Sequence, residues 1–529
     1  MPDEEVYELD LPVRTDHFEF GEGEPEMKKN HLMFVLTLLL VFILAACSTP
    51  VDELQETVES AATDVAPEVN EALTEAAPQI DAAATEAVAM ATEAADEVNA
   101  AATAAADEVN AAATAAAEAA PTVEAAATEV AEPEMRTDNL EGETITFYHF
   151  GDLSGPLAGI TAPLINGFND AVAAINANGG IRGAEIVLEF QDTQSNIDNA
   201  VAAYDRFTSE DDNVLVMFTY GSGDGEALAS RFAEDQIPNL AAGLSAVAFY
   251  GPDSGYTFGY APIYPDQFGY FLDYITVNWE TVKPAGAGDD IKLAYISWPT
   301  AYGQGAYTPE AIAYAESLGV EIVLSEVLEP SPQADATTAI LNAQAAGANV
   351  IYTNSLAFGP AAILNGMGSL GLRESFLFGA NNWACDLATY AFVSDPALVE
   401  GMMCAFPYLY WNDADNPGVQ YVESVFQTNS RTQAERGVGY LLTAAGVDLA
   451  VAAIEKAIDT VGFDALTGQA VYEALLSLGE YEVLDGIMRV DFSGDNRSPH
   501  VAQIRQIQGG QFVMLQDWTA TPDLRPAGE

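Results

Sequence analysis

From Thr144 onward the chain alternates between strand-like and helix-like segments, and this alternation limits the possible folds more than any other feature. The run TITFYHF at 144–150 is β-rich and ends in a loop of glycine, serine and proline. The next segment carries apolar residues at helical spacing, among them Leu164 and Phe168. Because strands and helices go on alternating, the sequence predicts a parallel, doubly wound sheet that binds ligands at the carboxyl ends of its strands.

The alternation restarts after Pro265 and predicts a second Rossmann-like α/β lobe, with a cleft between the two lobes. The run MMCAFPYLYW at 402–411 is expected to be a strand that leads back to the first lobe. Helices are expected at 417–429, 438–460 and 467–477, and the tail that follows has the character of a β-hairpin.

A glycine-rich loop joins a strand to a helix in the stretch LVMFTYGSGDGEALASRF, residues 215–232. Such a loop can hold an anion at the N-terminus of the helix. A nucleotide P-loop needs a lysine after its last glycine, but Glu226 and Ala227 follow here, and the dinucleotide motif G-x-G-x-x-G fails at Glu226 as well. Asp224 and Glu226 would repel a phosphate dianion, so a carboxylate is the anion that we expect.

The segment MKKNHLMFVLTLLLVFILAACSTP, which starts at Met27, has the order of a lipoprotein signal peptide. Two lysines precede an apolar core, Leu32 to Leu44, which spans roughly 20 Å as a helix and is short for a transmembrane anchor. LAAC at 44–47 matches a bacterial lipobox and predicts cleavage before Cys47, with a lipid on its sulfur. The acidic residues 1–26 are expected to be a mis-assigned start or an extension.

A low-complexity spacer rich in alanine, threonine and glutamate follows, over residues 47–143. The unit DEVNAAATAAA occurs at 96–106 and again at 107–117, and an eleven-residue period fits a right-handed coiled coil. The other interpretation is a partly helical, partly disordered tether that prolines interrupt, because few of these side chains could form a core. Either form would hold a folded domain away from the lipid.

Composition and motifs argue against several classes of function. The chain has 17 Lys and Arg against 80 Asp and Glu, a formal charge of −63, so it cannot neutralise the phosphates of a nucleic acid. Catalysis is not expected, since only His149 and His500 remain after cleavage and no serine lies in a G-x-S-x-G motif. No group of histidine, cysteine and carboxylate has metal-ligand spacing, so we expect no metal and no cofactor.

Cys385 and Cys404 are the cysteines that remain besides Cys47. Outside the cytoplasm such a pair favours a disulfide, and two separate buried thiols are the alternative. A loop of about twenty residues closed in this way would stabilise the fold by roughly 3 kcal/mol on the chain-entropy model.

The stretch GDLSGPLAGITAPLINGFNDAVAAINANGGIRG, which starts at Gly151, resembles the opening of the branched-chain-amino-acid (Leu/Ile/Val) class of periplasmic binding proteins, which feed ABC importers. The turn ISWPTAYGQGA and the passage ILNGMGSLGLRESFLFGAN are similar to the second lobe of that family. The resemblance covers roughly residues 144–519. It implies the type I periplasmic-binding fold, in which three crossover strands join two lobes that close on a ligand. We expect the crossings near Ile263, Phe406 and Leu484.

These observations divide the chain into six expected units. They are residues 1–26 (start or extension), 27–46 (signal peptide), 47–143 (spacer), 144–262 with 408–484 (lobe 1), 263–407 with 485–520 (lobe 2) and 521–529 (tail).

The resemblance also implies which residues bind the ligand. The hydroxyl of Ser222 and nearby backbone N–H groups would hold an α-carboxylate, and the loop AAGLSA would add a backbone carbonyl for an ammonium and a second hydroxyl. The alternative for both loops is ordinary turn glycines and a helix-capping serine. The expected ligand-binding residues are Ser154, Ser222, Gly223, Gly243, Ser245, Trp298, Tyr302 and Asn381.

Several positions depart from the family pattern. Aromatic residues of the family cleft fall on Ile160 and Leu356, and the acidic partner of the ligand ammonium aligns with Asn381 or Asn382. Asp386 could replace that acid after a shift of one turn. Otherwise the ligand is an amide, a urea-like compound or a carboxylate, because a buried ammonium is best held by a carboxylate.

The expected function is that of a monomeric, lipid-anchored, extracytoplasmic solute-binding protein, which delivers an amino acid or a related small polar solute to an ABC permease in the membrane. A sensory receptor of the same fold and a surface scaffold with inert lobes are the alternatives. Nucleic acid is not an expected partner.

Overall fold

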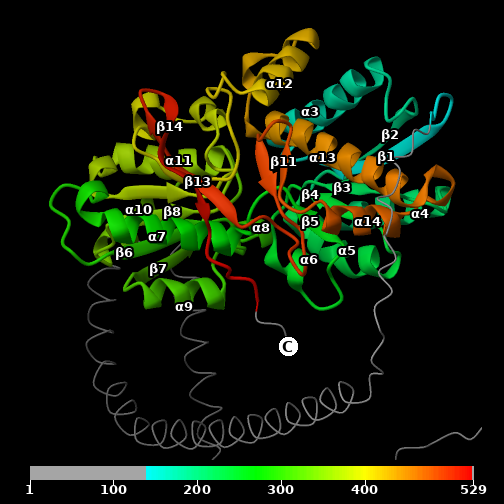
Figure 1. The fold of residues 1–529 in the computed structure, drawn as a ribbon. Coiled ribbons are helices and arrows are strands. Elements are labelled where there is room, and N and C mark those ends of the chain that lie inside the picture. The colour runs from blue at the N-terminus through cyan, green and yellow to red at the C-terminus, as the bar shows by residue number, and fades with distance from the viewer. Residues whose placement is uncertain (1–138, 527–529) are drawn as a thin grey trace, which may run out of the picture. The chain divides into compact units, whose positions relative to one another are not determined.

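The computed structural model describes residues 139–526 (Figure 1), so the signal peptide, Cys47 and most of the spacer lie outside the described residues. The first lobe is built on five parallel strands in the order β2-β1-β3-β4-β5. The strands are β1 (Thr144–Gly151), β2 (Glu185–Asp192), β3 (Met217–Thr219), β4 (Asn239–Ala241) and β5 (Thr257–Gly259). The helices between them are α3 (Ala158–Ala177), α4 (Ile197–Glu210), α5 (Ser222–Glu234) and α6 (Ala246–Tyr250).

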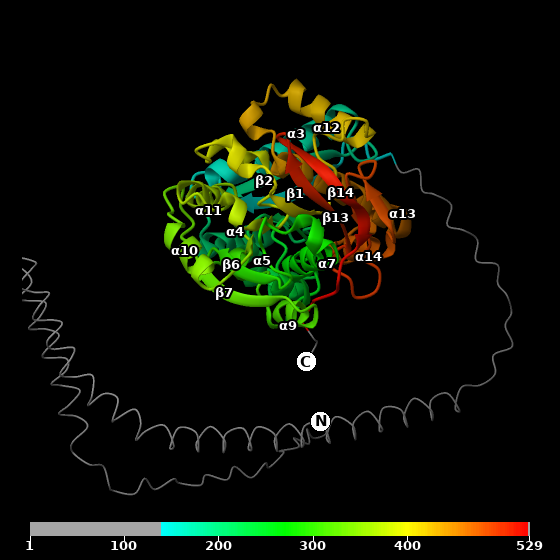
Figure 2. The same ribbon diagram turned by 90° about the vertical axis from the view of Figure 1, so that its left-hand side faces the viewer.

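The second lobe is built on seven strands in the order β14-β13-β10-β9-β8-β6-β7. The strands are β6 (Lys292–Ser297), β7 (Glu321–Val327), β8 (Val350–Thr353), β9 (Leu377–Ala380), β10 (Met403–Phe406), β13 (Val501–Gln508) and β14 (Gln511–Ala520). The helices are α7 (Tyr264–Val282), α8 (Ala301–Gln304), α9 (Pro309–Ser317), α10 (Thr337–Ala345) and α11 (Phe358–Ser369). The antiparallel pair β13–β14, red in Figures 1 and 2, closes one edge of this sheet.

Both sheets repeat one strand order. In the first, β2-β1-β3-β4-β5 are parallel, and β7-β6-β8-β9-β10 repeat that order in the second. This confirms the predicted pair of doubly wound lobes. The order reverses between β1 and β3 and between β6 and β8, and ligands of such sheets bind at these switch points. The inner strands β3 and β8 are buried throughout, as their continuous apolar sequences require.

Three connections join the lobes, which belong to one compact unit. The chain passes from β5 to α7 around Ile263 and leaves the second sheet after β10 ends at Phe406. The third passage lies beyond Leu484, because the N–H of Gly259 in β5 still donates to the carbonyl of Arg497 before β13 begins. Strands β11 (Tyr481–Val483) and β12 (Met488–Val490) precede β13 in the chain and form a separate two-stranded hairpin.

Helices α12 (Pro417–Thr428), α13 (Val438–Val461) and α14 (Gly468–Ser477) follow the second passage. α13 lies against α3 (Figure 1), and the backbones approach closely at Gly167, where a β-carbon would lie 2.4 Å from the carbonyl oxygen of Tyr440. Among the described residues, α13 is the one helix long and apolar enough to cross a membrane, but most of it is buried inside the fold. It therefore serves as a core helix of the first lobe.

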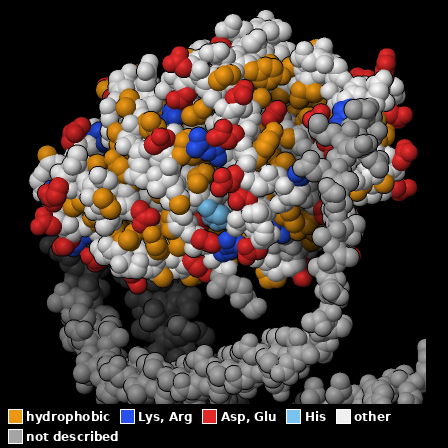
Figure 3. Space-filling view, in the orientation of Figure 1, with side chains coloured by type: hydrophobic (Ala, Val, Ile, Leu, Met, Phe, Trp, Pro, Cys, Tyr) orange, Lys and Arg blue, Asp and Glu red, His pale blue; other side chains and the backbone are white. Residues whose placement is uncertain are grey.

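Acidic side chains are spread over the face of the molecule that Figure 3 shows, with few Lys and Arg among them. This distribution agrees with the formal charge of −63. The described cations are largely engaged with carboxylates, as in the contact of Arg431 with Asp170 at 2.7 Å.

Candidate functional site

The glycine-rich loop places Ser222 at the start of α5, directly after the loop that follows β3. Its side chain is buried, and its hydroxyl lies 3.2 Å from the hydroxyl of Tyr264, the first residue of α7. The Tyr264 oxygen also accepts a hydrogen bond of 3.0 Å from the N–H of Leu244. The phenol of Tyr264 thus engages the hydroxyl of Ser222 and the N–H of Leu244 together. Gly223 is the next residue of the same turn and packs near Ile197.

The second first-lobe loop packs directly on the glycine-rich loop. A β-carbon on Gly243 would lie 2.5 Å from the backbone nitrogen of Ser222, so glycine permits this close approach. Ser245 donates to Glu226 over 2.6 Å and caps α6 by accepting the N–H of Val247. The structure therefore brings Ser222 and Gly243 together, while the hydroxyl of Ser245 is engaged within the first lobe.

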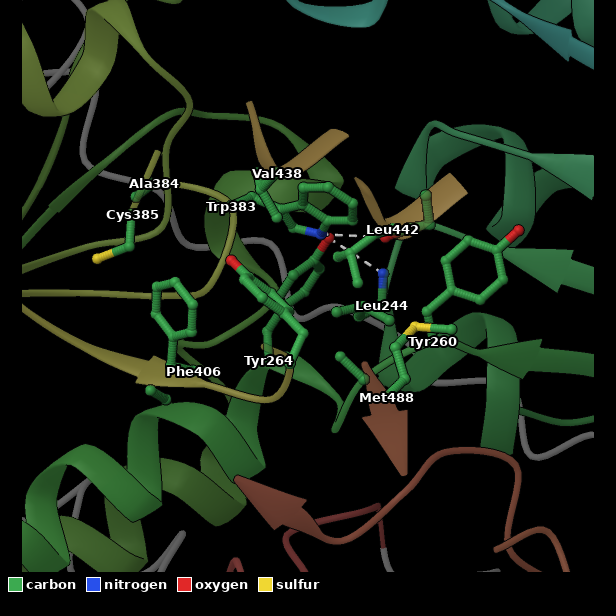
Figure 4. Close-up of a cluster of buried hydrophobic side chains, with 14 of the residues drawn as sticks. Leu244, Tyr260, Tyr264, Trp383, Ala384, Cys385, Phe406, Val438, Leu442 and Met488 are labelled. Atoms are coloured by element: carbon green, nitrogen blue, oxygen red, sulfur yellow. Dashed lines mark hydrogen bonds between the residues drawn. The ribbon is translucent and has the colours of Figure 1, made fainter. Parts of the chain in front are cut away.

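Trp383 reaches from the second lobe to these first-lobe loops. Its indole N–H donates to the carbonyl of Ala242 over 3.1 Å, and the side chain is buried. Figure 4 shows the indole of Trp383 and the phenol of Tyr264 pointing toward the loop at Leu244. The hydrogen bond of Trp383 is a direct link between the lobes at the carboxyl ends of their strands.

The second-lobe residues Trp298, Tyr302 and Asn381 lie together. The hydroxyl of Tyr302 donates to Oδ1 of Asn381 over 3.1 Å, and its ring packs edge-on against Trp298 and against Tyr264. Burial raises the pKa of Tyr302 well above its usual value, so the phenol stays a hydrogen-bond donor.

Several buried polar atoms near these residues have no hydrogen-bond partner. They are Nδ2 of Asn381, both side-chain polar atoms of Asn382, Oδ1 of Asn354 and Nε1 of Trp298. Buried polar groups are normally paired, with protein, water or a ligand. These groups are neutral donors and acceptors at the ends of β6, β8 and β9, which is the edge of the sheet that faces the first lobe.

Ser154 is apart from this cluster. Its side chain is exposed, donates to Asp192 over 2.5 Å and accepts from Gln194 over 2.9 Å. These bonds hold the loop between β1 and α3, and Ser154 does not line the pocket described next.

A pocket between the lobes lies beside Trp383. It is bounded by the first turns of α3 and α13 from the first lobe and by the loops after β8 and β9 from the second. Its walls are mainly aliphatic. The lining residues are Gly159, Ile160, Pro163, Leu164, Leu356, Ala357, Trp383, Asp386, Ala388, Ala434, Gly437, Val438 and Gly439.

Among the described residues that line this pocket, Asp386 is the one with a charged side chain. Its carboxylate accepts hydrogen bonds from the N–H of Val438 at the start of α13 (3.1 Å) and from the hydroxyl of Tyr410 (3.1 Å). Ala357 in the same wall has a φ of 33°, a strained value for a residue with a β-carbon. Strain of this kind concentrates where a ligand is clamped.

Some of these residues carry no signal in the sequence. Tyr264 and Val438 lie at helix starts. The contacts of Tyr264 with the first-lobe loops and the place of Val438 in the pocket wall depend on how the two lobes meet. Ile160 and Leu356 stand where the family resemblance places cleft aromatics, and Asp386 is the acid considered as a replacement for the ammonium partner; the structure locates all three in the pocket wall.

His149 is a core residue. It is fully buried, its Nδ1 lies 2.9 Å from the hydroxyl of Tyr220, and its ring stacks on Phe168. Burial lowers its pKa to about 3, so the imidazole is neutral. It does not line the pocket.

Cys385 and Cys404 are joined in a disulfide, with their α-carbons 6.3 Å apart. The bond ties the loop after β9, which carries Trp383 and Asp386, to β10. It therefore helps to position both pocket residues.

Two doubly wound lobes, three connections and a pocket between the lobes define a two-lobed solute-binding protein of the type I periplasmic-binding class. The model of the family described as "Periplasmic binding protein" matches residues 144–511, and the chain belongs to that family. The location of the family implies that the protein works outside the cytoplasm.

Curated relatives are similar over most of their length. The chain is 24% identical to Leu/Ile/Val-binding protein homolog 1 of Brucella suis over 373 residues, which is 69% of this chain and 91% of the relative. It is 26% identical to Leu/Ile/Val-binding protein homolog 7 of Brucella abortus over 368 residues, 68% of this chain and 88% of the relative. These relatives are binding proteins.

Solved structures share the fold. A branched-chain amino acid ABC transporter protein from Thermus thermophilus with bound valine aligns with a TM-score of 0.63 and 21% identity, over 72% of this chain and 97% of that one. The fatty acid ABC transporter substrate-binding protein from Thermomonospora curvata aligns with a TM-score of 0.61 and 17% identity, over 74% of this chain and 96% of that one.

Proposed function

We propose that this protein is the lipid-anchored solute-binding component of an ABC importer and that it binds an amino acid or a related small polar solute between its lobes. The observation that carries the proposal is the hydrogen bond between the indole of Trp383 and the carbonyl of Ala242. It places the polar groups of the first lobe next to the interlobe pocket, with only an aromatic side chain between them.

The solute takes the place of this indole. A carboxylate or amide oxygen accepts from Ser222 and from the N–H of Leu244, in place of the Tyr264 phenol that contacts both in this structure. An ammonium or amide N–H donates to the Ala242 carbonyl and toward Asp386. Ser154 and Ser245 are engaged elsewhere and hold the two loops in position.

The apolar part of the solute lies among the aliphatic pocket walls. Ile160, Leu164 and Val438 supply surface from the first lobe, and Leu356 supplies it from the second. Burial of such a part contributes roughly 25 cal/mol per Å² of apolar surface. Relatives named for leucine, isoleucine and valine and the valine-bound structural neighbour support this solute class.

The neutral side-chain amides of the second lobe are also compatible with a solute that has no ammonium group. Asn381 and Asn382 offer buried donors and acceptors that have no partner. An amide or urea-like solute would satisfy them without introducing a charge.

Binding shifts the protein toward the closed form, because the solute contacts both lobes only when the lobes are closed. The three connections act as the hinge, and the permease recognises the closed form. The lipobox at Cys47 and the spacer support a tethered protein that keeps its lobes within reach of the membrane.

Intrinsic fluorescence tests the proposed displacement of Trp383. The full-length protein is titrated with L-valine, L-asparagine and acetamide, and the emission of its tryptophans is recorded in the wild type and in Trp383→Phe. A solute that binds in this place changes the emission of the wild type more than that of the variant. Equal changes in both proteins would show that the solute binds without moving Trp383.

A transport protein, a sensory receptor and a scaffold differ in whether they bind a solute and in whether the solute-loaded protein activates a permease. A permease in proteoliposomes whose ATPase activity rises with the solute-loaded protein supports transport. Loaded protein that leaves the ATPase unchanged points to a sensory receptor, and a chain that binds no solute points to a scaffold.

A further inference from the structure

Three side chains from distant parts of the chain meet beside the hinge. Asp266 stands in the first turn of α7, His500 directly precedes β13, and Asp523 follows β14. One potential metal-ligating atom from each residue lies within 4.8 Å of the others. The positions 266, 500 and 523 are too far apart in sequence to form a metal-binding motif, which is why the sequence predicts no metal site here.

Asp266 is fully buried, and its two oxygens differ in their surroundings. Oδ1 accepts the N–H of Leu524 over 2.7 Å. Oδ2 has no hydrogen-bond partner, and Nδ1 of His500 lies 3.3 Å away. A carboxylate that is fully buried needs a donor or a cation on each oxygen. Oδ2 therefore points into the cluster with unmet bonding capacity.

His500 has two buried ring nitrogens without a hydrogen-bond partner, although 22% of its side chain is exposed. Its backbone is fixed, because its carbonyl accepts the N–H of Thr521 over 2.8 Å. The 3.3 Å between Nδ1 of His500 and Oδ2 of Asp266 fits two ligands of one ion, each bound at about 2.0–2.2 Å.

Asp523 closes the group from the C-terminal segment. Nε of Arg525 donates to both of its oxygens, over 2.8 and 2.9 Å. The backbone N–H of Arg525 also donates to Oδ1, over 3.3 Å, and Nη2 lies 2.7 Å from Oδ2. These bonds orient Asp523, and a metal ion would replace one of them, because a carboxylate has about four lone-pair sites. Hydrogen bonds of this kind commonly hold the ligating carboxylates of metal sites in place.

We propose that Asp266, His500 and Asp523 bind a divalent transition-metal ion of the zinc class. One imidazole and two carboxylates suit such an ion better than Ca²⁺ or Mg²⁺, which take oxygen ligands, and water completes the coordination. The site is separate from the solute pocket.

The consequence concerns the hinge. Asp266 follows the first connection between the lobes and His500 ends the third, while Asp523 belongs to the segment after the last strand. A metal ion would join these segments at one point. It would stiffen the second-lobe end of the hinge and fix the C-terminal segment against α7.

Metal binding to the full chain tests the proposal. The protein is stripped with a chelator that is then removed, and Co²⁺ is added while the visible absorption of the ion is recorded; Zn²⁺ is added in a parallel thermal-unfolding series. The wild type is expected to give cobalt absorption bands that Zn²⁺ abolishes, and a higher Tm with Zn²⁺. His500→Gln and Asp266→Asn are expected to weaken binding by roughly tenfold or more.

Asp495→Asn is the matched control, because Asp495 contacts Arg525 at 3.2 Å but is exposed and stands outside the group. It is expected to bind like the wild type. Absence of cobalt bands in the wild type, or bands unchanged in His500→Gln, would overturn the proposal and leave Asp266 and His500 as an ion pair. If Asp266→Asn does not fold, His500→Gln alone tests the metal site. None of these measurements depends on solute binding.

Discussion

The carboxylate of Asp386 in the second lobe accepts a hydrogen bond of 3.1 Å from the backbone N–H of Val438, the first residue of α13 in the first lobe. The contact crosses the pocket that we assign to the solute. A carboxylate is stabilised at a helix N-terminus, so Asp386 links the lobes while it faces the place that we propose for a ligand ammonium.

Asp386→Asn is expected to weaken the binding of an ammonium-bearing solute by at least about tenfold, because a charge-assisted hydrogen bond is lost. Isothermal titration calorimetry measures the change. Asp395→Asn is the control. Asp386 caps the 3₁₀ helix Leu387–Ala391 and Asp395 caps the 3₁₀ helix Pro396–Val399, but Asp395 does not line the pocket. An unchanged affinity in Asp386→Asn would show that the solute ammonium lies elsewhere.

Trp383→Phe is expected to lower the free energy of unfolding by about 1–3 kcal/mol, since the buried carbonyl of Ala242 loses its donor. It should also raise the radius of gyration of the ligand-free protein in small-angle scattering, because a bond between the lobes is removed. Trp279→Phe loses a comparable bond to Gly288 within one lobe and should leave the radius unchanged. Equal radii in all three proteins would contradict a role for Trp383 between the lobes.

Strand and helix positions were largely predictable because their patterns are local. The helix expected at 438–460 is α13, Val438–Val461, and the strand expected before the glycine-rich loop contains β3, Met217–Thr219. Strand β5 was not predicted, because its three residues stand among glycines and prolines, whereas β3 lies in a longer apolar run.

The site was predictable only where the family resemblance supplied positions. Ser222 and Gly243 meet, but the engagement of Ser222 by Tyr264 depends on the angle between the lobes, which no local pattern encodes. The loop that carries Ser154 was also identified from the resemblance. Its side chain, however, is exposed and bonds to Asp192 and Gln194 instead of lining the pocket.

Asp224, in the glycine-rich loop, makes stability depend on pH. Burial raises its pKa to about 7, although the N–H of Gly221 favours the charged form. The unfolded chain ionises near pH 4, so stability contributed by the neutral carboxyl is full below that pH and declines as the pH rises to about 7.

Asp224→Asn should therefore raise the free energy of unfolding by up to about 4 kcal/mol above pH 7, with the gain vanishing toward pH 4. Chemical denaturation at pH 4, 6 and 8 measures it. A variant whose stability follows that of the wild type at every pH would show that Asp224 is not the group responsible.

The disulfide between Cys385 and Cys404 should stabilise the protein by about 3 kcal/mol, because it closes a loop in the unfolded chain. A reducing agent is expected to lower the Tm of the wild type and to leave that of the Cys385→Ser/Cys404→Ser double variant unchanged. If the reducing agent leaves the Tm of the wild type unchanged, the disulfide does not contribute to stability.

A thermal-shift screen of the full-length protein against amino acids, amides, ureas and carboxylates tests the central claim most directly. We predict that at least one compound stabilises the protein, by about 2.7 kcal/mol at 100 times its Kd, and that Ser222→Ala abolishes this shift. A shift that persists in Ser222→Ala would refute the assignment of the first-lobe loop. Failure of every compound to shift the wild type would contradict solute binding itself.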